Sequence, residues 1–230
     1  MSSSERTAEQ AKIDNVAKMG DEIGSIYSAL WQEIAWLHRK WAEYVALFGT
    51  NSTRIALLNS AAPTFFRTVQ DSLWENVLLH LARVTDSPKS AGRSNLSIRR
   101  LASAVSGSPI DSEMLALQAV ALEATEFARA WRNRKLAHSD LDLALDEHVD
   151  PLAPASRADV VTALASLGEL LNVVSVHFLD STTMFEMDPE GKDAVLLLYI
   201  LRDGLLHAEE RLAKVTSGEL GFQHLCRDPL

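Results

Sequence analysis

Proline is absent from the first 62 residues of the chain, and apolar residues recur there every three or four positions. They are Ile13, Val16, Ile23, Ile26, Tyr27, Leu30, Ile34, Leu37, Trp41, Tyr44, Val45 and Phe48. This spacing places them on one stripe of an α-helix. The pattern predicts a long helix from about residue 8 to residue 48, weakened in its first half by Gly20 and Gly24 and followed by Gly49 as a helix terminator.

The rest of the chain repeats this pattern between short breaks. Further stripes predict helices over residues 63–85, 96–105, 111–136, 157–178 and 193–215, with Asp111 and Ser156 as N-caps. Ten glycines and seven prolines in 230 residues are too few for the many turns of a β-sandwich or barrel. The sequence therefore predicts an all-α fold. It is a single helical bundle of five or six helices in one domain, residues 1–230, with a core over about 8–215 and loosely held tails.

Composition excludes several classes of protein. Cys226 is the one cysteine, so an internal disulfide and a cysteine-rich zinc site are both excluded. The longest apolar run, Ala194 to Leu201, is far shorter than a membrane span, and the polar N-terminus lacks the apolar stretch of a signal peptide. We therefore expect a cytoplasmic protein without a membrane partner. Its net charge of −9 excludes a uniform basic surface, so any contact with nucleic acid is local.

Two short segments reverse this negative charge. The segment 128–140, ARAWRNRKLAHSD, contributes Arg129, Arg132, Arg134 and Lys135, and the second segment contributes Lys89, Arg93, Arg99 and Arg100. Cations at a helix C-terminus are also favourable by about 0.3–1 kcal/mol each, so helix-end chemistry is an alternative explanation for any one of them. The pairs His138/Asp140 and His148/Asp150 offer two metal ligands each, but such pairs in acidic loops are usually solvated. We predict no metal and no cofactor.

Arg132, Asn133 and His138 form the arrangement R-N-x4-H. Fifteen arginines and seven histidines make a match of this kind expected by chance, and Arg202-Asp203 with His207 is a second one. The first match lies at the basic end of a helix, whereas the second lies in mid-helix among acidic residues. Six residues of ideal helix place Arg132 and His138 roughly 120° apart, so the helix must bend or end between them. Arg134, four residues before His138, is the better neighbour on the same face.

The element WRNRKLAH, together with LWENVLLHLARVTD (73–86) and IAWLHRKWAEYVALFG (34–49), resembles the abortive-infection, AbiU-type branch of the HEPN superfamily. The resemblance implies a helical, commonly dimeric, metal-independent endoribonuclease of a toxin–antitoxin-like or anti-phage system, with the Arg/His motifs of two subunits at a shared cleft. In this sequence it implies that His138 transfers protons, Arg132 binds the scissile phosphate and Asn133 orients it. Arg129, Arg134 and Lys135 then contact RNA, and a neutralising partner protein is expected.

Cleavage of RNA by an arginine and a histidine can also be argued from chemistry alone, without the resemblance to a family. RNA carries its own nucleophile, the 2′-hydroxyl, so a histidine that exchanges protons at neutral pH and an arginine that grips phosphate suffice. The alternative is a catalytically silent helical module that binds a protein or RNA partner, which the charge of −9 favours. Along the helix over 63–85, we also expect a buried Arg83–Asp86 pair that fixes packing.

Overall fold

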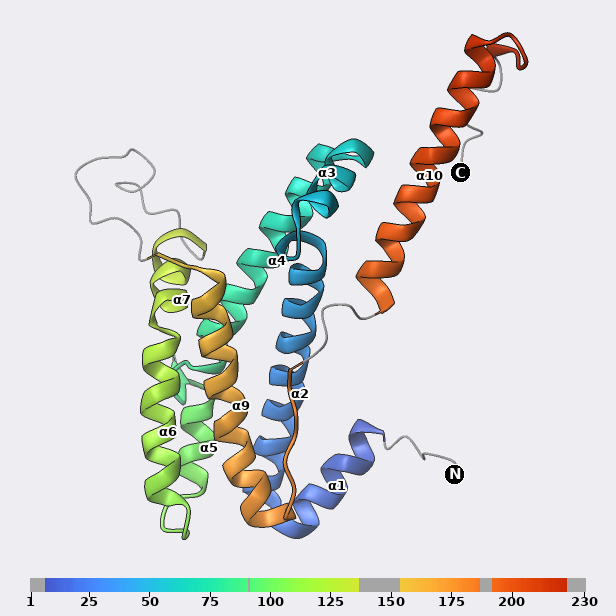
Figure 1. The fold of residues 1–230 in the computed structure, drawn as a ribbon. Coiled ribbons are helices and arrows are strands. Elements are labelled where there is room, and N and C mark those ends of the chain that lie inside the picture. Colours follow the sequence, from blue (N-terminus) through green and yellow to red (C-terminus); the bar gives the residue numbers. More distant parts are fainter. Residues whose placement is uncertain (1–6, 91, 137–153, 187–191, 223–230) are drawn as a thin grey trace, which may run out of the picture. The chain divides into compact units, whose positions relative to one another are not determined.

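The computed structural model describes residues 7–90, 92–136, 154–186 and 192–222. Within these ranges the chain forms nine α-helices, two short π-helices and one small hairpin (Figure 1). In chain order they are α1 (Ala8–Met19), α2 (Asp21–Tyr44), η1 (Val45–Gly49), α3 (Ser52–Ala61), α4 (Pro63–Val84), β1 (Lys89–Ser90), β2 (Arg93–Ser94), α5 (Ile98–Ala104), α6 (Asp111–Ala124), α7 (Glu126–Trp131), η2 (Arg132–Leu136), α9 (Arg157–Leu179) and α10 (Lys192–Thr216). The predicted all-α fold is confirmed.

The described helices outnumber the five or six predicted because two long segments are divided. Gly20 has φ of 81°, a conformation that glycine adopts without strain, and it separates α1 from α2. The Thr125 hydroxyl donates to the Ala121 carbonyl at 2.7 Å, where α6 ends and α7 begins. The apolar pattern did not predict α3, whose N-cap is Asn51. Ser156 caps α9 as predicted, in a capping box with Asp159.

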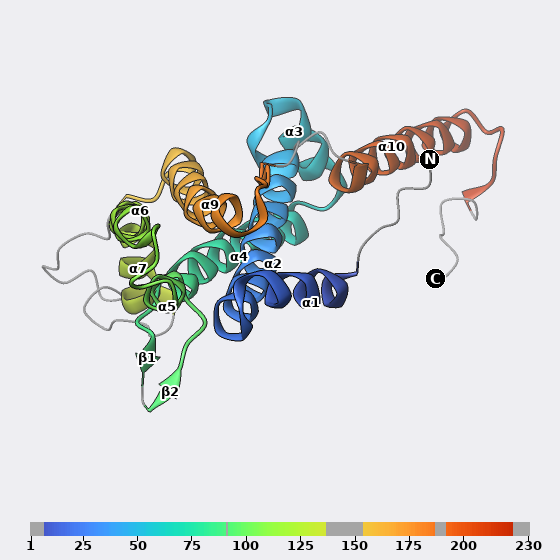
Figure 2. The same cartoon turned by 90° about the horizontal axis from the view of Figure 1, so that it is seen from below.

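The fold groups into two compact units, residues 1–41 with 74–187 and residues 42–73 with 188–230. The first unit is built around α9, which lies between α6 and α2 in both views (Figures 1 and 2). Fully buried leucines from three helices form its centre, namely Leu30 and Leu37 of α2, Leu78 and Leu81 of α4, and Leu167, Leu170 and Leu171 of α9. Lys89–Ser90 and Arg93–Ser94 pair as an antiparallel hairpin that leads into α5 (Figure 2).

The second unit has a smaller core of its own. Residues from η1, α3, α4 and α10 form it, namely Ala46, Leu47, Leu58, Phe66, Ala194 and Leu198. A carboxylate oxygen of Glu43 accepts a hydrogen bond from the backbone N–H of Ala194 at 3.1 Å. This contact holds the first turn of α10 within the unit.

One described helix, α9, is long and apolar enough to cross a membrane by length and composition alone. More than half of its most apolar window is buried in the fold. Ten of its residues, including Leu167, Leu170 and Leu171, are buried. The apolar side chains of α9 are therefore the contacts of a core helix, as in a soluble helical domain.

Gly24 lets α1 pack closely against α2. A Cβ at this position would lie 2.6 Å from Cα of Val16, a backbone atom that moves only with α1 itself. We expect Gly24→Ala to displace α1 and to break the 3.0 Å hydrogen bond from Asn15 to Ser28. Overpacking costs about 1–3 kcal/mol and the better helix propensity of alanine returns about 1 kcal/mol, so the net loss of unfolding free energy is about 1 kcal/mol. Urea denaturation measures it, and unchanged stability would contradict the close packing.

Candidate functional site

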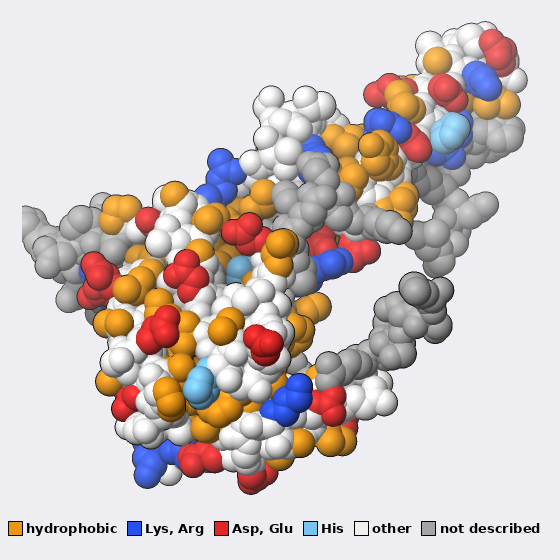
Figure 3. Space-filling model, turned by 60° about the horizontal axis from the view of Figure 1, so that its bottom comes forward, with side chains coloured by type: hydrophobic (Ala, Val, Ile, Leu, Met, Phe, Trp, Pro, Cys, Tyr) orange, Lys and Arg blue, Asp and Glu red, His pale blue; other side chains and the backbone are white. Residues whose placement is uncertain are grey.

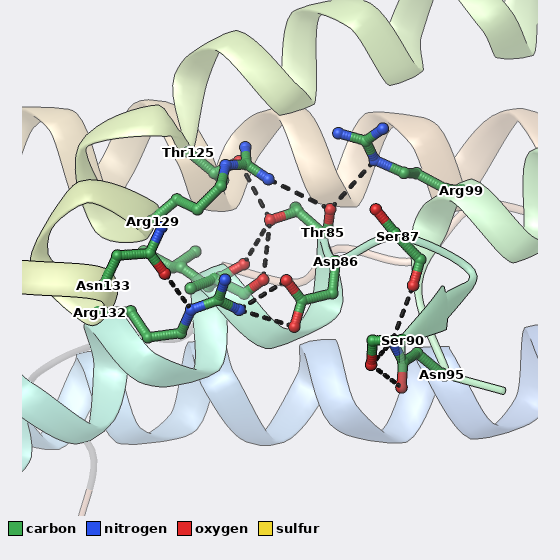
Figure 4. A network of polar contacts seen from close by, with 12 residues as sticks. Thr85, Asp86, Ser87, Ser90, Asn95, Arg99, Thr125, Arg129, Arg132 and Asn133 are labelled. Carbon is green, nitrogen blue, oxygen red and sulfur yellow. Dashed lines mark hydrogen bonds and ion pairs between the residues drawn. The ribbon is translucent and has the colours of Figure 1, made fainter. Parts of the chain in front are cut away.

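Arg132 lies where α7 ends and the π-helix η2 begins, and its guanidinium is held by Asp86 (Figure 4). Nη1 donates to both carboxylate oxygens of Asp86, at 2.6 and 2.7 Å. Nε donates to the amide oxygen of Asn133 at 3.1 Å. The side chains of Arg132 and Asp86 are 24% and 28% exposed, so the pair lies at the surface of the first unit. The hydrogen bonds of Arg132 to the described residues thus run through Nη1 and Nε.

Two more arginines converge beside this pair. Arg99 and Arg129 both donate to the backbone carbonyl of Thr85, at 3.2 and 3.3 Å (Figure 4). Arg129 also donates to the carbonyl of Leu122 at 3.2 Å. Burial lowers the pKa of Arg129, the nearby charge of Arg99 lowers it further, and Asp86 opposes the change. Arg99, Arg129 and Arg132 thus form a cluster of three cations that the carboxylates of Asp86 and Glu126 neutralise only in part, which leaves a local excess of positive charge in an acidic protein.

Two buried threonines set the positions of these groups. Thr85 follows the last residue of α4 and its hydroxyl donates to the carbonyl of Leu81 at 2.9 Å. The Thr125 hydroxyl lies 3.4 Å from that of Thr85, so the break between α6 and α7 lies against the end of α4. Asp86 is therefore presented directly beside the first residues of η2.

The other residues predicted for the site lie on or after η2. Asn133 and Lys135 are exposed and Arg134 is half-buried. Nζ of Lys135 lies 4.9 Å from the ring centroid of Trp131, a cation–π contact. His138 lies outside the described residues. The structure thus brings Arg129, Arg132 and Asn133 to one place and leaves the position of the predicted proton-transfer group undescribed.

The expected Arg83–Asp86 pair is wrong. Arg83 pairs instead with Glu33 of α2 at 2.8 Å, and Asp86 pairs with Arg132. The reason is that α4 ends at Val84, so Asp86 has left the helix face on which a spacing of three would bring it to Arg83. Sequence reasoning missed Asp86 and Arg99 as parts of the site, although both belong to segments that stood out for resemblance or charge.

A hollow elsewhere in the first unit carries negative rather than positive charge. A hollow of about 470 Å³ lies between α6 and α9 and is lined mainly by Leu117, Val173 and Val176 with the acidic Glu113 and Glu169. Acidic side chains repel phosphate, so this hollow does not suit RNA. In the described ranges no group of three or more His, Cys, Asp or Glu side chains converges as a metal site.

Comparison with known proteins bears on this arrangement. Residues 20–196 match the family of HEPN proteins described as AbiU2, a stretch that contains every residue of the Arg132–Asp86 cluster. Neither the comparison with curated proteins nor the comparison with solved structures found a match. The matched stretch covers more than half of the chain. The chain therefore belongs to the AbiU2 family of the HEPN superfamily.

Proposed function

We propose that this protein is a metal-independent endoribonuclease of a bacterial abortive-infection or toxin–antitoxin-like defence system, acting in the cytoplasm. The observation that carries the proposal is the cluster of Arg99, Arg129 and Arg132, which the carboxylates of Asp86 and Glu126 neutralise only in part. Its excess positive charge gives an acidic protein a local site for an RNA backbone. Family membership supports the same assignment.

Each residue has a role in this proposal. Arg132, anchored through Nη1, turns Nη2 toward a non-bridging phosphate oxygen, while Asn133 holds Nε. His138, six residues later, takes the proton from the RNA 2′-hydroxyl as that oxygen attacks the phosphorus. The bond from phosphorus to the 5′-oxygen breaks, the leaving oxygen takes a proton from water, and the products are a 2′,3′-cyclic phosphate and a 5′-hydroxyl. Because the substrate supplies the nucleophile, the step needs no metal.

The proposal also includes the remaining cations of η2 and a second copy of the chain. Arg134 and Lys135 extend the positive charge along η2 and contact the flanking phosphates of the RNA. Two copies of the chain, with their motifs at a shared cleft, supply two such surfaces. A neutralising partner protein, where one exists, covers the same cationic cluster.

Cleavage of RNA by the purified protein in EDTA tests the proposal. We expect wild-type protein to produce 2′,3′-cyclic phosphate ends and His138→Ala to cleave at least about 100-fold more slowly, the contribution typical of general acid–base catalysis. His207→Ala is the matched control, because His207 belongs to the second Arg/His match, with Arg202, and lies exposed beside Glu210. Its cleavage rate should equal that of the wild type. Folded wild-type protein that cleaves no RNA, or a His138→Ala variant as active as the wild type, contradicts the proposal.

The second candidate function is binding of a partner without cleavage. The Asp86–Arg132 pair favours it, because a carboxylate already occupies one side of the guanidinium. This function predicts that wild-type protein binds RNA, that Arg132→Ala weakens the binding, and that no new RNA ends appear. Fluorescence anisotropy with end-labelled RNA, followed by electrophoresis of the same samples, separates the two functions.

A further inference from the structure

The hairpin of β1 and β2 begins a stretch of the chain that has no acidic residue. Residues 87–110 contain no aspartate or glutamate, although the chain has 31 of them in all. The same stretch contains four cations, Lys89, Arg93, Arg99 and Arg100. Two of these are already engaged, because Arg99 belongs to the arginine cluster and Arg100 pairs with Glu22 at 2.9 Å. The other two lie on the hairpin, one on each strand.

The two cations of the hairpin are exposed and point to opposite faces. The hairpin projects from the helices of the first unit (Figure 2). Within the described residues, neither Lys89 nor Arg93 forms an ion pair. The strand register pairs Lys89 with Ser94 and Ser90 with Arg93. Cross-strand partners share a face, and successive residues alternate between faces. Arg93 therefore shares a face with Ser90, and Lys89 lies on the other face.

Asn95 joins the face of Arg93 to the segment that carries Asp86. The side-chain amide of Asn95 donates to the Ser90 hydroxyl at 2.9 Å and to the Ser87 carbonyl at 2.8 Å. In Figure 4, the carboxylate of Asp86 and the side chains of Ser90 and Asn95 lie on the same side of the backbone at Ser87. The hairpin face that carries Arg93 is therefore turned to the same side as the carboxylate of Asp86.

Cations at this place suit a polyanion that the rest of the protein repels. The net charge is −9, and Figure 3 shows acidic side chains spread over the face that it presents. An RNA strand at the arginine cluster is therefore retained by local cations alone. An exposed guanidinium presents a planar fork of donors that matches two phosphate oxygens. Contacts of this kind position a nucleic acid without reading its bases.

We propose that Arg93 is a second phosphate-binding residue of the RNA site and that the hairpin is the arm that presents it. This inference rests on the proposed function, because it needs RNA to bind at the cluster. Arg132 binds the scissile phosphate, whereas Arg93 binds a phosphate of the flanking nucleotides. The substrate it implies is an RNA strand that extends beyond the scissile bond, not a dinucleotide. In cleavage assays Arg93→Ala should therefore raise KM and leave kcat unchanged.

Binding of a labelled, single-stranded 2′-O-methyl RNA, followed by fluorescence anisotropy at several salt concentrations, tests the arm. This RNA has no free 2′-hydroxyl, so the wild-type protein binds it without cleaving it. Arg93→Ala should weaken binding about tenfold at low salt, the loss of one charge-assisted contact. It should also reduce the slope of log Kd against log salt by about 0.7, the value for one phosphate of a single strand. Arg93→Lys keeps the charge and should keep the wild-type slope.

Lys89→Ala is the matched control, because it removes one positive charge from the same hairpin but on the opposite face. Its slope should equal that of the wild type. Equal losses for Lys89→Ala and Arg93→Ala would reveal an effect of net charge alone and overturn the proposal. If Arg132→Ala weakens binding but Arg93→Ala does not, the arm is wrong and the proposed function stands. A folded wild type that binds no RNA overturns both.

Discussion

Acidification from pH 6.5 to pH 4 is expected to lower the free energy of unfolding by about 3 kcal/mol through His80 alone. The ring is 2% exposed and bridges two charged groups, with Nδ1 3.0 Å from Nζ of Lys40 and Nε2 2.7 Å from Oε2 of Glu33. Since the Lys40 ammonium only donates, Nδ1 accepts and Nε2 carries the proton that faces Glu33. The native state therefore holds the neutral ring.

Acid lowers the stability because the unfolded state binds the His80 proton at a higher pH than the folded state does. Burial, and then the charges of Lys40 and Arg83, lower the pKa of His80 to about 4, against the opposing effect of Glu33. In the unfolded chain the ring titrates near its ordinary pKa of about 6.5. Between these values the unfolded state binds more protons, so stability is complete above about pH 6.5 and falls as the pH falls. Burial also lowers the pKa of His38, which adds in the same direction.

Urea denaturation at several pH values measures this loss. His80→Gln should flatten the profile between pH 6.5 and pH 4, because an amide can donate to Glu33 and accept from Lys40 without titrating. The slope caused by His38 should remain. His177→Gln, a substitution at an exposed ring, should keep the full wild-type profile. Equal slopes for wild type and His80→Gln would show that His80 is not held neutral in the fold.

Asp86→Asn is expected to reduce RNA cleavage by about 100-fold, the effect of misplacing a binding group by about 1 Å. The amide keeps the size of the side chain but cannot hold the Arg132 guanidinium by two charge-assisted bonds. Stability should fall by about 1–2 kcal/mol, less than for a fully buried pair because water reaches both side chains. Asp86 is therefore a positioning residue in the proposed reaction.

The control is Asp71→Asn on α4, the helix that ends two residues before Asp86. Asp71 pairs with Arg67 at 2.9 Å, but the two side chains are 52% and 74% exposed. This substitution should leave cleavage unchanged and shift stability by less than about 0.5 kcal/mol. Faster cleavage by Asp86→Asn would contradict the positioning role, since it would mean that the carboxylate competes with RNA for Arg132. A KM that rises while kcat stays constant would restrict Asp86 to substrate binding.

Most helices of this fold can be predicted from apolar spacing, because residues that face a core must recur with the helical period. The helix start at Ser156 can be predicted equally well, because its capping box joins residues that are close in the sequence. The breaks between helices at Gly20 and Thr125 cannot be predicted in this way, since glycine and threonine also occur inside intact helices. The division at Thr125 comes with a contact to a distant part of the chain, the hydroxyl of Thr85.

The candidate site could be predicted only in part, because the sequence shows local patterns but not the contacts between distant residues. A run of arginines is visible in the sequence, and it drew attention to Arg129 and Arg132. The partner of Arg132 is 46 positions away in the sequence, at the end of a different helix, and no local pattern connects the two. For Arg83 the local pattern gave the wrong partner. Its spacing favoured Asp86, but Arg83 pairs with Glu33 of α2.

The central place of α9 has a consequence for the order of events during synthesis. Helix α9 packs against both α6 and α1, so the N-terminal helix waits for a partner encoded about 140 residues later. Until residue 179 has left the ribosome, the leucines of α2 and α4 have no α9 to cover them. A growing chain of this kind completes its core late, and a nascent or truncated product presents exposed apolar helices to chaperones and proteases.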